Sequence, residues 1–346
     1  MKLLVTGHRG YIGTILVPRL KAAGHRVVGA DIDLYRGCDF TPGHADTTPW
    51  CGPPDIRDIT PEHLADIDAV IHLAGLSNDP LGNIDPSLTD AINRRATLDL
   101  AKAAKAAGVS RFLFSSSCSN YGASGSDDWL DEEAPLRPVT PYARSKVDSE
   151  AALANLADET FSPVFLRSAT AYGVSPRLRF DLVLNNLTAW AMATGQIRLK
   201  SDGSAWRPLV HIIDIAQAFE RALTAPREAI HAQAFNVGHN RDCMRVRDLA
   251  EKIQAALPET RITFASGAIA DTRTYRVDCS KIADIGFAPC WSVEDGIAEL
   301  RNALSRYPVT PEDFEGPRFA RVAHLRMCMD TGRRTQSLRE TDMTVA

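Results

Sequence analysis

The sequence lacks the features that mark membrane, nucleic-acid-binding and disulfide-stabilised proteins. No apolar run approaches the roughly 20 residues needed to cross a bilayer, and 39 basic residues are outnumbered by 43 acidic ones. The net charge of −4 supplies no basic field for a nucleic acid or an anionic membrane. The seven cysteines are odd in number and never form a close CxxC pair. We therefore expect a cytoplasmic protein with reduced thiols, no metal site, and no nucleic-acid or membrane partner.

What the sequence does contain is an alternation of short apolar strands and helical patterns. Its 346 residues, 45% of them hydrophobic, are enough for two lobes. The alternation predicts an α/β fold with a doubly wound parallel (Rossmann) sheet and a smaller, mostly C-terminal lobe. Predicted strands cover 2–6, 26–31, 68–73, 110–116, 162–168, 197–200 and 208–211, and predicted helices cover 11–23, 86–107, 141–158, 181–194, 213–224, 245–257 and 292–304.

Three glycines follow the first predicted strand at a spacing that suits a phosphate-binding turn. In the segment TGHRGYIG, Gly7 permits a tight turn, Gly10 lets a diphosphate approach the backbone, and Gly13 lets the next helix pack against the sheet. Free amides at the start of that helix would hold the phosphates. A glycine-rich strand exit can also be only a turn. The residues expected to contact a cofactor here are Gly7, Gly10, Tyr11, Ile12 and Gly13.

A second buried strand, Arg26-Val-Val-Gly-Ala-Asp31, ends in an acid 18 residues after Gly13. A carboxylate at this place accepts hydrogen bonds from the adenosine ribose hydroxyls and repels a 2′-phosphate. NAD is therefore favoured over NADP as the cofactor. Two observations weaken the inference: Arg9 and Arg36 are available to recruit a 2′-phosphate, and Asp31 alone is also compatible with a solvated strand end.

The candidate chemistry lies in Tyr142-Ala-Arg-Ser-Lys146, on a helix that Thr140-Pro141 would open. Both side chains project from one helix face. The lysine ammonium and a positive nicotinamide ring favour the phenolate, which lowers the tyrosine pKa toward the working pH of a general base. Lys146 can also hold the nicotinamide ribose. By itself this spacing more often marks a solvated helix face.

Small hydroxyl residues follow the apolar strand 112–114. Ligands of open α/β sheets bind at the carboxyl ends of the strands. Ser117 is therefore placed to hydrogen-bond a substrate hydroxyl or carbonyl. A polar strand exit that leads into a turn is the alternative.

Taken in order, these motifs make the chain resemble the extended short-chain dehydrogenase/reductase family, specifically its NAD-dependent nucleotide-sugar epimerase/dehydratase group, over roughly residues 1–300. Each motif is common alone, whereas the ordered set is specific. The family elements TGxxGxxG, D(I/L)xD, HxAA, SSxxxYG, YxxxK, LRxxNxYG, RDxxHxxD and FNVG appear at 6–13, 55–58, 72–75, 116–122, 142–146, 166–173, 207–214 and 235–238.

The resemblance implies a retained NAD, a nucleoside-diphosphate sugar as substrate, and a homodimer formed through helices 86–107 and 141–158. It implies that Arg207 and Asn186 contact the sugar-nucleotide diphosphate, although a surface ion pair and a helix-face amide are the simpler alternatives. Further cofactor contacts are implied for Asp55, Ile56, Leu73, Ala74 and Gly75. The residues assigned to the substrate are Ser77, Cys118, Ser119, Asn120, Thr170, Asn186, Arg207 and Arg273, with Arg276 as a further candidate.

The sequence also departs from the family pattern. Dehydratases of the group carry acids directly after the catalytic Ser/Thr, where this chain has Cys118 and Ser119. Without them, elimination of water lacks its usual proton shuttle, and Asp79 would be the first substitute to test. Thr170 replaces the usual asparagine and Pro208 an aspartate, so the sugar pocket is not standard.

We therefore expect an enzyme that inverts C4 of a nucleoside-diphosphate sugar through a transient 4-keto sugar, with Tyr142 as base, Ser117 holding the oxygen and Lys146 in support. Residues 1–172 would form the NAD-binding domain, with 208–238 returning to it, and 173–346 the substrate-binding lobe and C-terminal tail. The last dozen residues are expected to be poorly ordered. The alternatives are a reductase or dehydrogenase, a multi-step C3/C5-type epimerase using Cys118 as a second acid/base, a less favoured 4,6-dehydratase, and a non-catalytic NAD-sensing protein.

Overall fold

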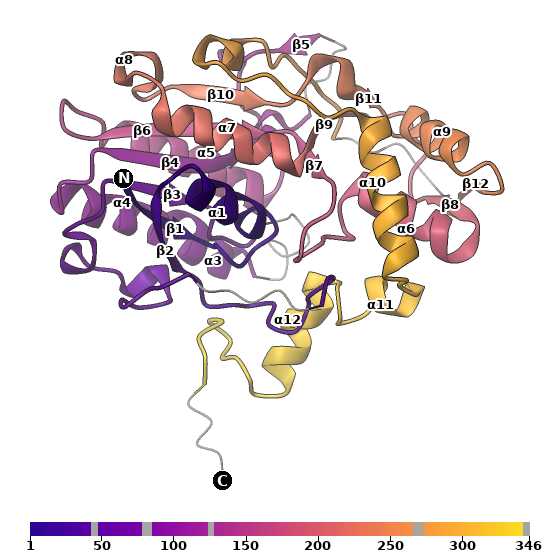
Figure 1. Cartoon of the computed structure of the whole chain (residues 1–346), viewed down its shortest axis with the longest axis horizontal. Coiled ribbons are helices and arrows are strands. Elements are labelled where there is room, and N and C mark those ends of the chain that lie inside the picture. Colours follow the sequence, from indigo (N-terminus) through magenta and orange to yellow (C-terminus); the bar gives the residue numbers. More distant parts are fainter. Residues whose placement is uncertain (43–47, 78–84, 124–127, 266–270, 272, 342–346) are drawn as a thin grey trace.

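A six-stranded parallel sheet forms the centre of the protein (Figure 1). The structure is a computed structural model that describes residues 1–42, 48–77, 85–123, 128–265, 271 and 273–341. The strand order reverses between β1 and β3, which confirms the predicted doubly wound α/β class. In spatial order the strands are β10 (Ala234–Val237), β6 (Ser162–Ser168), β4 (Arg111–Ser117), β3 (Ala69–His72), β1 (Lys2–Thr6) and β2 (Arg26–Ala30).

Strand β1 shows why the sheet is buried on both faces. Leu3, Leu4 and Val5 are all inaccessible to solvent. Leu3 and Val5 pack into one hydrophobic cluster with helices α1 (Gly13–Ala22) and α7 (Ile212–Thr224), whereas Leu4 packs into the other. That second cluster contains residues of α4 (Ala96–Ala106) and α5 (Pro141–Ala154). A continuous apolar run is therefore required here, as is usual for parallel sheets.

The predicted helix 86–107 is interrupted by a wider turn. α3 (Pro86–Thr89) leads into a π-helical turn over Asp90–Arg95, and α4 follows. The turn carries Asn93, whose Oδ1 accepts from Leu76 N at 2.7 Å and whose Nδ2 donates to Leu76 O at 3.0 Å. Asn93 thereby fixes the chain that leaves β3, and such π turns often occur at functional sites.

Outside the central sheet, the described residues form three small sheets and further helices. Within residues 208–238, β10 pairs with β6 of the central sheet and α7 packs against that sheet, whereas β9 pairs with β7 and β11. The small sheets are β11 (Cys243–Arg245), β9 (Trp206–His211) and β7 (Thr170–Tyr172); β12 (Arg261–Phe264) and β8 (Gln196–Leu199); and β13 (Arg276–Val277) and β5 (Trp129–Leu130). The helices are α6 (Val183–Thr194), α8 (Arg227–Ile230), α9 (Val246–Ala256), α10 (Val293–Arg306), α11 (Pro311–Glu315) and α12 (Arg321–Asp330).

The C-terminal tail is ordered further than its composition predicts. The expectation of poor order from residue 335 onward is wrong for 335–341, because Leu338 is buried against Leu76 and Ile92 and a β-bridge joins Arg334 to Glu340. No helix in the described part of the chain has the length and apolarity needed to cross a membrane.

Candidate active site

A cleft opens at the carboxyl ends of β1, β2 and β3, where the strand order reverses. It encloses about 990 Å³ including its open mouth. Open α/β sheets bind ligands at this position. The structure brings every cofactor contact predicted for the first 75 residues to this cleft: Gly7, Gly10, Tyr11, Ile12, Gly13, Asp31, Asp55, Ile56, Leu73, Ala74 and Gly75.

The glycine turn leaves no room for side chains. Gly7 has a φ of +70°, and a Cβ there would lie 2.7 Å from the backbone nitrogen of Ala74. A Cβ on Gly13 would lie 2.5 Å from the Cα of His8. The loop therefore packs tightly against the end of β3, and it leads into the N-terminus of α1 at the cleft, a position that suits a phosphate group.

Asp31 is held by backbone amides at the end of β2. Its carboxylate accepts from Arg9 N at 2.9 Å and from Asp33 N at 2.7 Å. Burial raises the pKa of Asp31. The guanidinium groups of Arg9 and Arg36 instead pair with Asp33, at 3.7 and 3.6 Å. These two arginines, the candidates for recruiting a 2′-phosphate, therefore already have an acidic partner.

Asp55 has a close partner that the sequence motif does not reveal. Arg57 Nε donates to Asp55 Oδ1 and Oδ2 at 2.9 and 3.0 Å, and Arg57 Nη2 lies 2.6 Å from Oδ2. Although burial opposes it, hydrogen bonding from Arg57 lowers the pKa of Asp55. Asp55 and Ile56 both line the cleft.

Helix α5 presents the tyrosine and the lysine together. Thr140 caps it by accepting from Ala143 N at 3.1 Å. Lys146 Nζ lies 5.8 Å from the centroid of the Tyr142 ring and donates to the carbonyl of Ser115 at 2.7 Å. Burial lowers the pKa of Lys146 to about 8, against the opposing effect of Glu150. The ammonium group is thus fixed between the end of β4 and the phenol.

Ser117 is the last residue of β4, two positions after Ser115, whose carbonyl accepts from Lys146. Its Oγ accepts from Ser119 N at 3.1 Å and from Ser119 Oγ at 2.9 Å, so it caps the short turn that follows the strand. Arg179 lines the cleft, whereas Ser117, Tyr142 and Lys146 are not among its lining residues. Although burial opposes it, the ion pair with Asp181 raises the pKa of Arg179.

Two predicted substrate residues point into the protein interior instead. The Sγ of Cys118 is buried and donates to the carbonyl of Arg167 at 3.1 Å, and burial raises its pKa. Asn120 is fully buried and donates to Glu150 Oε1 at 3.0 Å. The turn after β4 directs both side chains inward. We therefore do not assign either residue to the substrate, and this geometry removes the support for Cys118 as a second acid/base.

Beneath the tyrosine and lysine lies a buried ion pair that sequence reasoning missed. Arg167 Nη2 lies 2.7 Å from Glu150 Oε2, and the two side chains are only 7% and 6% exposed. Ser116 donates its hydroxyl proton to the same carboxylate. Glu150 stands one helical turn after Lys146, and Arg167 belongs to the LRxxNxYG element. Charged residues are mostly exposed in proteins, so the sequence alone does not predict that Glu150 and Arg167 are buried. The available signals were the four-residue spacing of Glu150 from Lys146 and the place of Arg167 in the 166–173 motif.

Two of the predicted diphosphate residues, Arg207 of β9 and Arg273, lie together and are not part of the cleft lining. Arg207 Nη2 lies 2.6 Å from Asp271 Oδ2, and Arg273 Nη2 lies 2.9 Å from the same oxygen. Asn186 donates to the carbonyl of Phe180 at 2.8 Å. The two arginines thus share one carboxylate.

The remaining predicted substrate residues lie in different settings. Ser77 lines the cleft, and Thr170 is half-buried in β7. Asp79 lies outside the described residues. In the part of the chain that the structure describes, no cluster of His, Cys, Asp and Glu side chains is arranged to hold a metal ion.

His72, from the HxAA element, is a buried linker. Its Nδ1 lies 2.7 Å from Thr6 Oγ1, and its Nε2 lies 2.7 Å from Thr97 Oγ1. Burial lowers the pKa of His72 to about 3. Thr6 Oγ1 also accepts from Ala74 N at 3.3 Å, and Thr97 donates to the carbonyl of Asn93 at 2.7 Å. The motif histidine therefore ties β1 to the π-helical turn.

The model of the NAD dependent epimerase/dehydratase family matches residues 3–238. The chain belongs to this family. NAD is accordingly its cofactor, and the glycine turn and amide-bound Asp31 described above fit that molecule. A family member named UDP-glucose 4-epimerase, from Mycolicibacterium smegmatis, is 29% identical over 320 residues, covering 86% of this chain and 97% of the relative.

Two further relatives show the range of the family. A protein from Streptomyces griseus named dTDP-glucose 4,6-dehydratase is 27% identical, covering 86% of this chain and 92% of its own. The solved structure of MoeE5 in complex with UDP-glucuronic acid and NAD is similar with a TM-score of 0.75 and 26% identity, covering 88% of this chain and 99% of that one. The family therefore includes both epimerases and dehydratases.

Proposed function

We propose that the protein is an NAD-dependent nucleoside-diphosphate-sugar epimerase that inverts C4 through a transient 4-keto sugar. The observation that carries this proposal is the position of Lys146, which donates to the Ser115 carbonyl of β4 and lies 5.8 Å from the centroid of the Tyr142 ring. The cleft at the ends of β1, β2 and β3 supplies the residues that fit NAD. The similarity to a protein named UDP-glucose 4-epimerase supports C4 as the inverted carbon and a UDP-sugar as the substrate class.

Three residues of the chain act at the reacting hydroxyl of the sugar in this proposal. Tyr142 removes the proton from the reacting hydroxyl, and the Lys146 ammonium stabilises the phenolate that the tyrosine must become. Ser117 holds the reacting oxygen from the end of β4. When bound, NAD supplies the reversible oxidation at the carbon, so no cofactor is consumed over the full cycle. Inversion requires the transient ketone to turn in the pocket, so that the hydride would return to its opposite face, and Tyr142 then gives the proton back to the oxygen.

The diphosphate of the substrate belongs with Arg207, Arg273 and Asn186 in this proposal. The arginines now share Asp271, and their forks can grip phosphate oxygens in its place. We further propose that residues 1–172 form the NAD-binding domain and 173–346 the substrate-binding lobe and tail.

The assembly and location are also proposals. We expect a homodimer through α4 and α5, which light scattering at several concentrations would test. We expect a cytoplasmic location, because all seven cysteines are free thiols and such thiols persist in a reducing compartment.

The alternative of a 4,6-dehydratase is disfavoured by the turn after β4. The two residues that follow Ser117 are a buried thiol and a serine whose hydroxyl bonds to Ser117. Neither suits the acid role in an elimination.

A panel of UDP-, GDP-, CDP- and dTDP-sugars, with products followed by NMR in deuterated water, tests the proposal. We expect a reversible mixture of C4 epimers from the right substrate, with no solvent deuterium on ring carbons. Deuterium at a ring carbon would instead indicate proton abstraction beside a ketone. A stoichiometric 4-keto-6-deoxy product would overturn the assignment and direct attention to Asp79.

A further inference from the structure

The C-terminal segment (residues 321–341) lies against the cofactor cleft. It begins with α12, which lies beside the chain that leaves β2 (Figure 1). Arg334 is buried, and its Nη2 donates to the carbonyl of Ile32, the residue after the ribose-binding Asp31, at 2.6 Å. Arg334, which follows Ile32 by 302 residues in the sequence, therefore hydrogen-bonds to the backbone on the adenosine side of the cleft.

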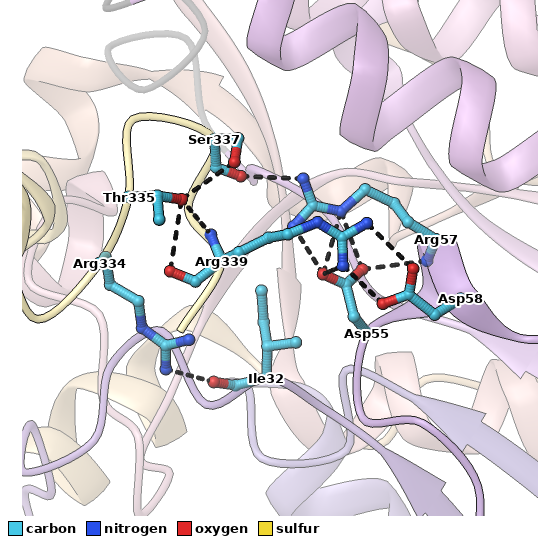
Figure 2. Close-up of polar contacts among 8 residues, drawn as sticks. All are labelled: Ile32, Asp55, Arg57, Asp58, Arg334, Thr335, Ser337 and Arg339. Atoms are coloured by element: carbon cyan, nitrogen blue, oxygen red, sulfur yellow. Dashed lines mark hydrogen bonds and ion pairs between the residues drawn. The ribbon is translucent and has the colours of Figure 1, made fainter. Parts of the chain in front are cut away.

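A second contact joins the segment to the predicted adenine side. Figure 2 shows Arg339 reaching Asp58, with its Nη2 3.0 Å from Oδ1 and its Nη1 3.4 Å from the carboxylate of Asp55. In return, Arg57 Nη1 donates to the carbonyl of Ser337 at 2.8 Å. Two guanidinium groups thus interlock the segment with the DIRD turn at 55–58.

The segment also contributes a charged group to the cleft itself. Arg321 lines the cleft with the glycine turn. Its guanidinium donates to Ser77 Oγ at 2.9 Å and lies 4.3 Å from the centroid of the Tyr35 ring. Burial and the nearby Arg179 lower the pKa of Arg321. Arg321 is thus a half-buried cation that lies near a second cation.

The pairing of the cleft arginines sets Arg321 apart. Each of the other four arginines that line the cleft pairs with an aspartate, and the partners are Asp33 for Arg9, Asp55 for Arg57, Asp33 and Asp39 for Arg177, and Asp181 for Arg179. Among the described residues, no carboxylate lies within 4 Å of Arg321. A desolvated cation without an anion is costly. A ligand that brings a negative charge would remove this cost.

We propose that the C-terminal segment forms one wall of the cofactor site, and that Arg321 binds the diphosphate of NAD. The glycine turn lines the same cleft and places its helix amides where an anion is favoured, whereas Arg207 and Arg273 do not line it. Arg334 and Arg339 hold this wall against the adenosine side. NAD can then leave only when the segment detaches, so the cofactor dissociates slowly and is retained through many turnovers.

Arg321→Ala tests the diphosphate contact, with Arg326→Ala as the matched control because Arg326 is an exposed arginine on the same helix. Isothermal titration of the apo protein with NAD, without any sugar, gives the affinity independently of the proposed epimerase activity. We expect Arg321→Ala to weaken NAD binding at least about tenfold, as loss of a charge-assisted hydrogen bond does, and Arg326→Ala to leave it unchanged.

A second titration, with UDP in the presence of saturating NAD, separates the two possible diphosphates. We expect Arg321→Ala to leave UDP affinity unchanged. We also expect the apo Arg321→Ala protein to melt no lower than the apo wild type, since the variant removes a cation that lacks an anionic partner. Loss of UDP affinity with unchanged NAD affinity would overturn the proposal, and so would equal losses of NAD affinity in both arginine variants.

Arg339→Ala tests the wall itself. Its side chain is partly exposed and does not itself line the cleft, and it pairs with Asp58 and with the cleft residue Asp55. We expect the dissociation rate of NAD, measured by dilution into a trap that consumes free NAD, to rise at least about tenfold. Arg333→Ala, an exposed neighbour in the same segment, should dissociate NAD at the wild-type rate. An unchanged rate in Arg339→Ala would refute retention by the segment.

Discussion

Glu150→Gln should destabilise the protein strongly although it keeps the size of the side chain. In the native structure Arg167 Nε donates to both Glu150 oxygens at 3.1 Å, and Arg167 Nη2 donates to Oε2 at 2.7 Å. Glutamine would place an amide NH₂ against these donors and leave the guanidinium as a buried, uncompensated charge. Breaking a buried pair in this way costs about 3–5 kcal/mol, so we expect a loss of about 3 kcal/mol or more.

Urea denaturation followed by tryptophan fluorescence measures this loss. The NAD concentration must be fixed, because bound cofactor adds to apparent stability. The control is the double variant Glu150→Leu with Arg167→Met, which removes both charges at similar volume and should be less destabilised than Glu150→Gln alone. A loss under about 1 kcal/mol, typical of exposed pairs, would refute the reasoning. A double variant that is destabilised more than Glu150→Gln would do the same.

Three further outcomes follow from the site. Tyr142→Phe should lower turnover by about 10²-fold or more while NAD affinity stays unchanged by titration; nearly full turnover would remove Tyr142 from the mechanism. NAD should bind at least tenfold more tightly than NADP, since anion repulsion at Asp31 readily exceeds the roughly 1.4 kcal/mol required, and Asp31→Asn should narrow the gap; equal affinities in the wild type would show that Asp31 faces elsewhere. Because the pKa of Lys146 lies at about 8, its charge is present below that pH and lost above it, so turnover should fall above about pH 8. Lys146→Arg should move that alkaline limb upward if the variant retains activity, and a flat wild-type profile up to pH 10 would contradict this account.

Sequence reasoning located the elements whose signals are local. The predicted strand 162–168 matches β6, and the prolyl start of α5 at Pro141 was predicted from Thr140-Pro141. The glycine turn and Asp31 meet in the cleft because a parallel sheet brings the ends of its strands to one edge. These features depend on residue type and spacing, which a sequence displays directly.

The features that sequence reasoning missed depend on contacts between distant segments. The inward orientation of Cys118 and Asn120 follows from the tight turn after β4, which a run of small polar residues does not reveal. The C-terminal segment has no long apolar periodicity, and its order depends on one buried leucine and on arginines whose partners lie near residues 32 and 55–58. No spacing rule connects residues so far apart in the chain.

The hydrogen bonds of His72 can have only one direction. Thr97 uses its proton for the carbonyl of Asn93, so its oxygen must accept from Nε2–H of His72, and Nδ1 must then accept from Thr6. This leaves a neutral imidazole of a single tautomer in a chain of aligned dipoles that reinforce one another. Because the pKa of His72 is about 3, the imidazole stays neutral, and the direction of these hydrogen bonds stays the same, near neutral pH. The hydrogen bonds that fix Ala74 at the edge of the cleft therefore do not change with pH between 5 and 8. A titration observed in that range belongs to a group other than His72.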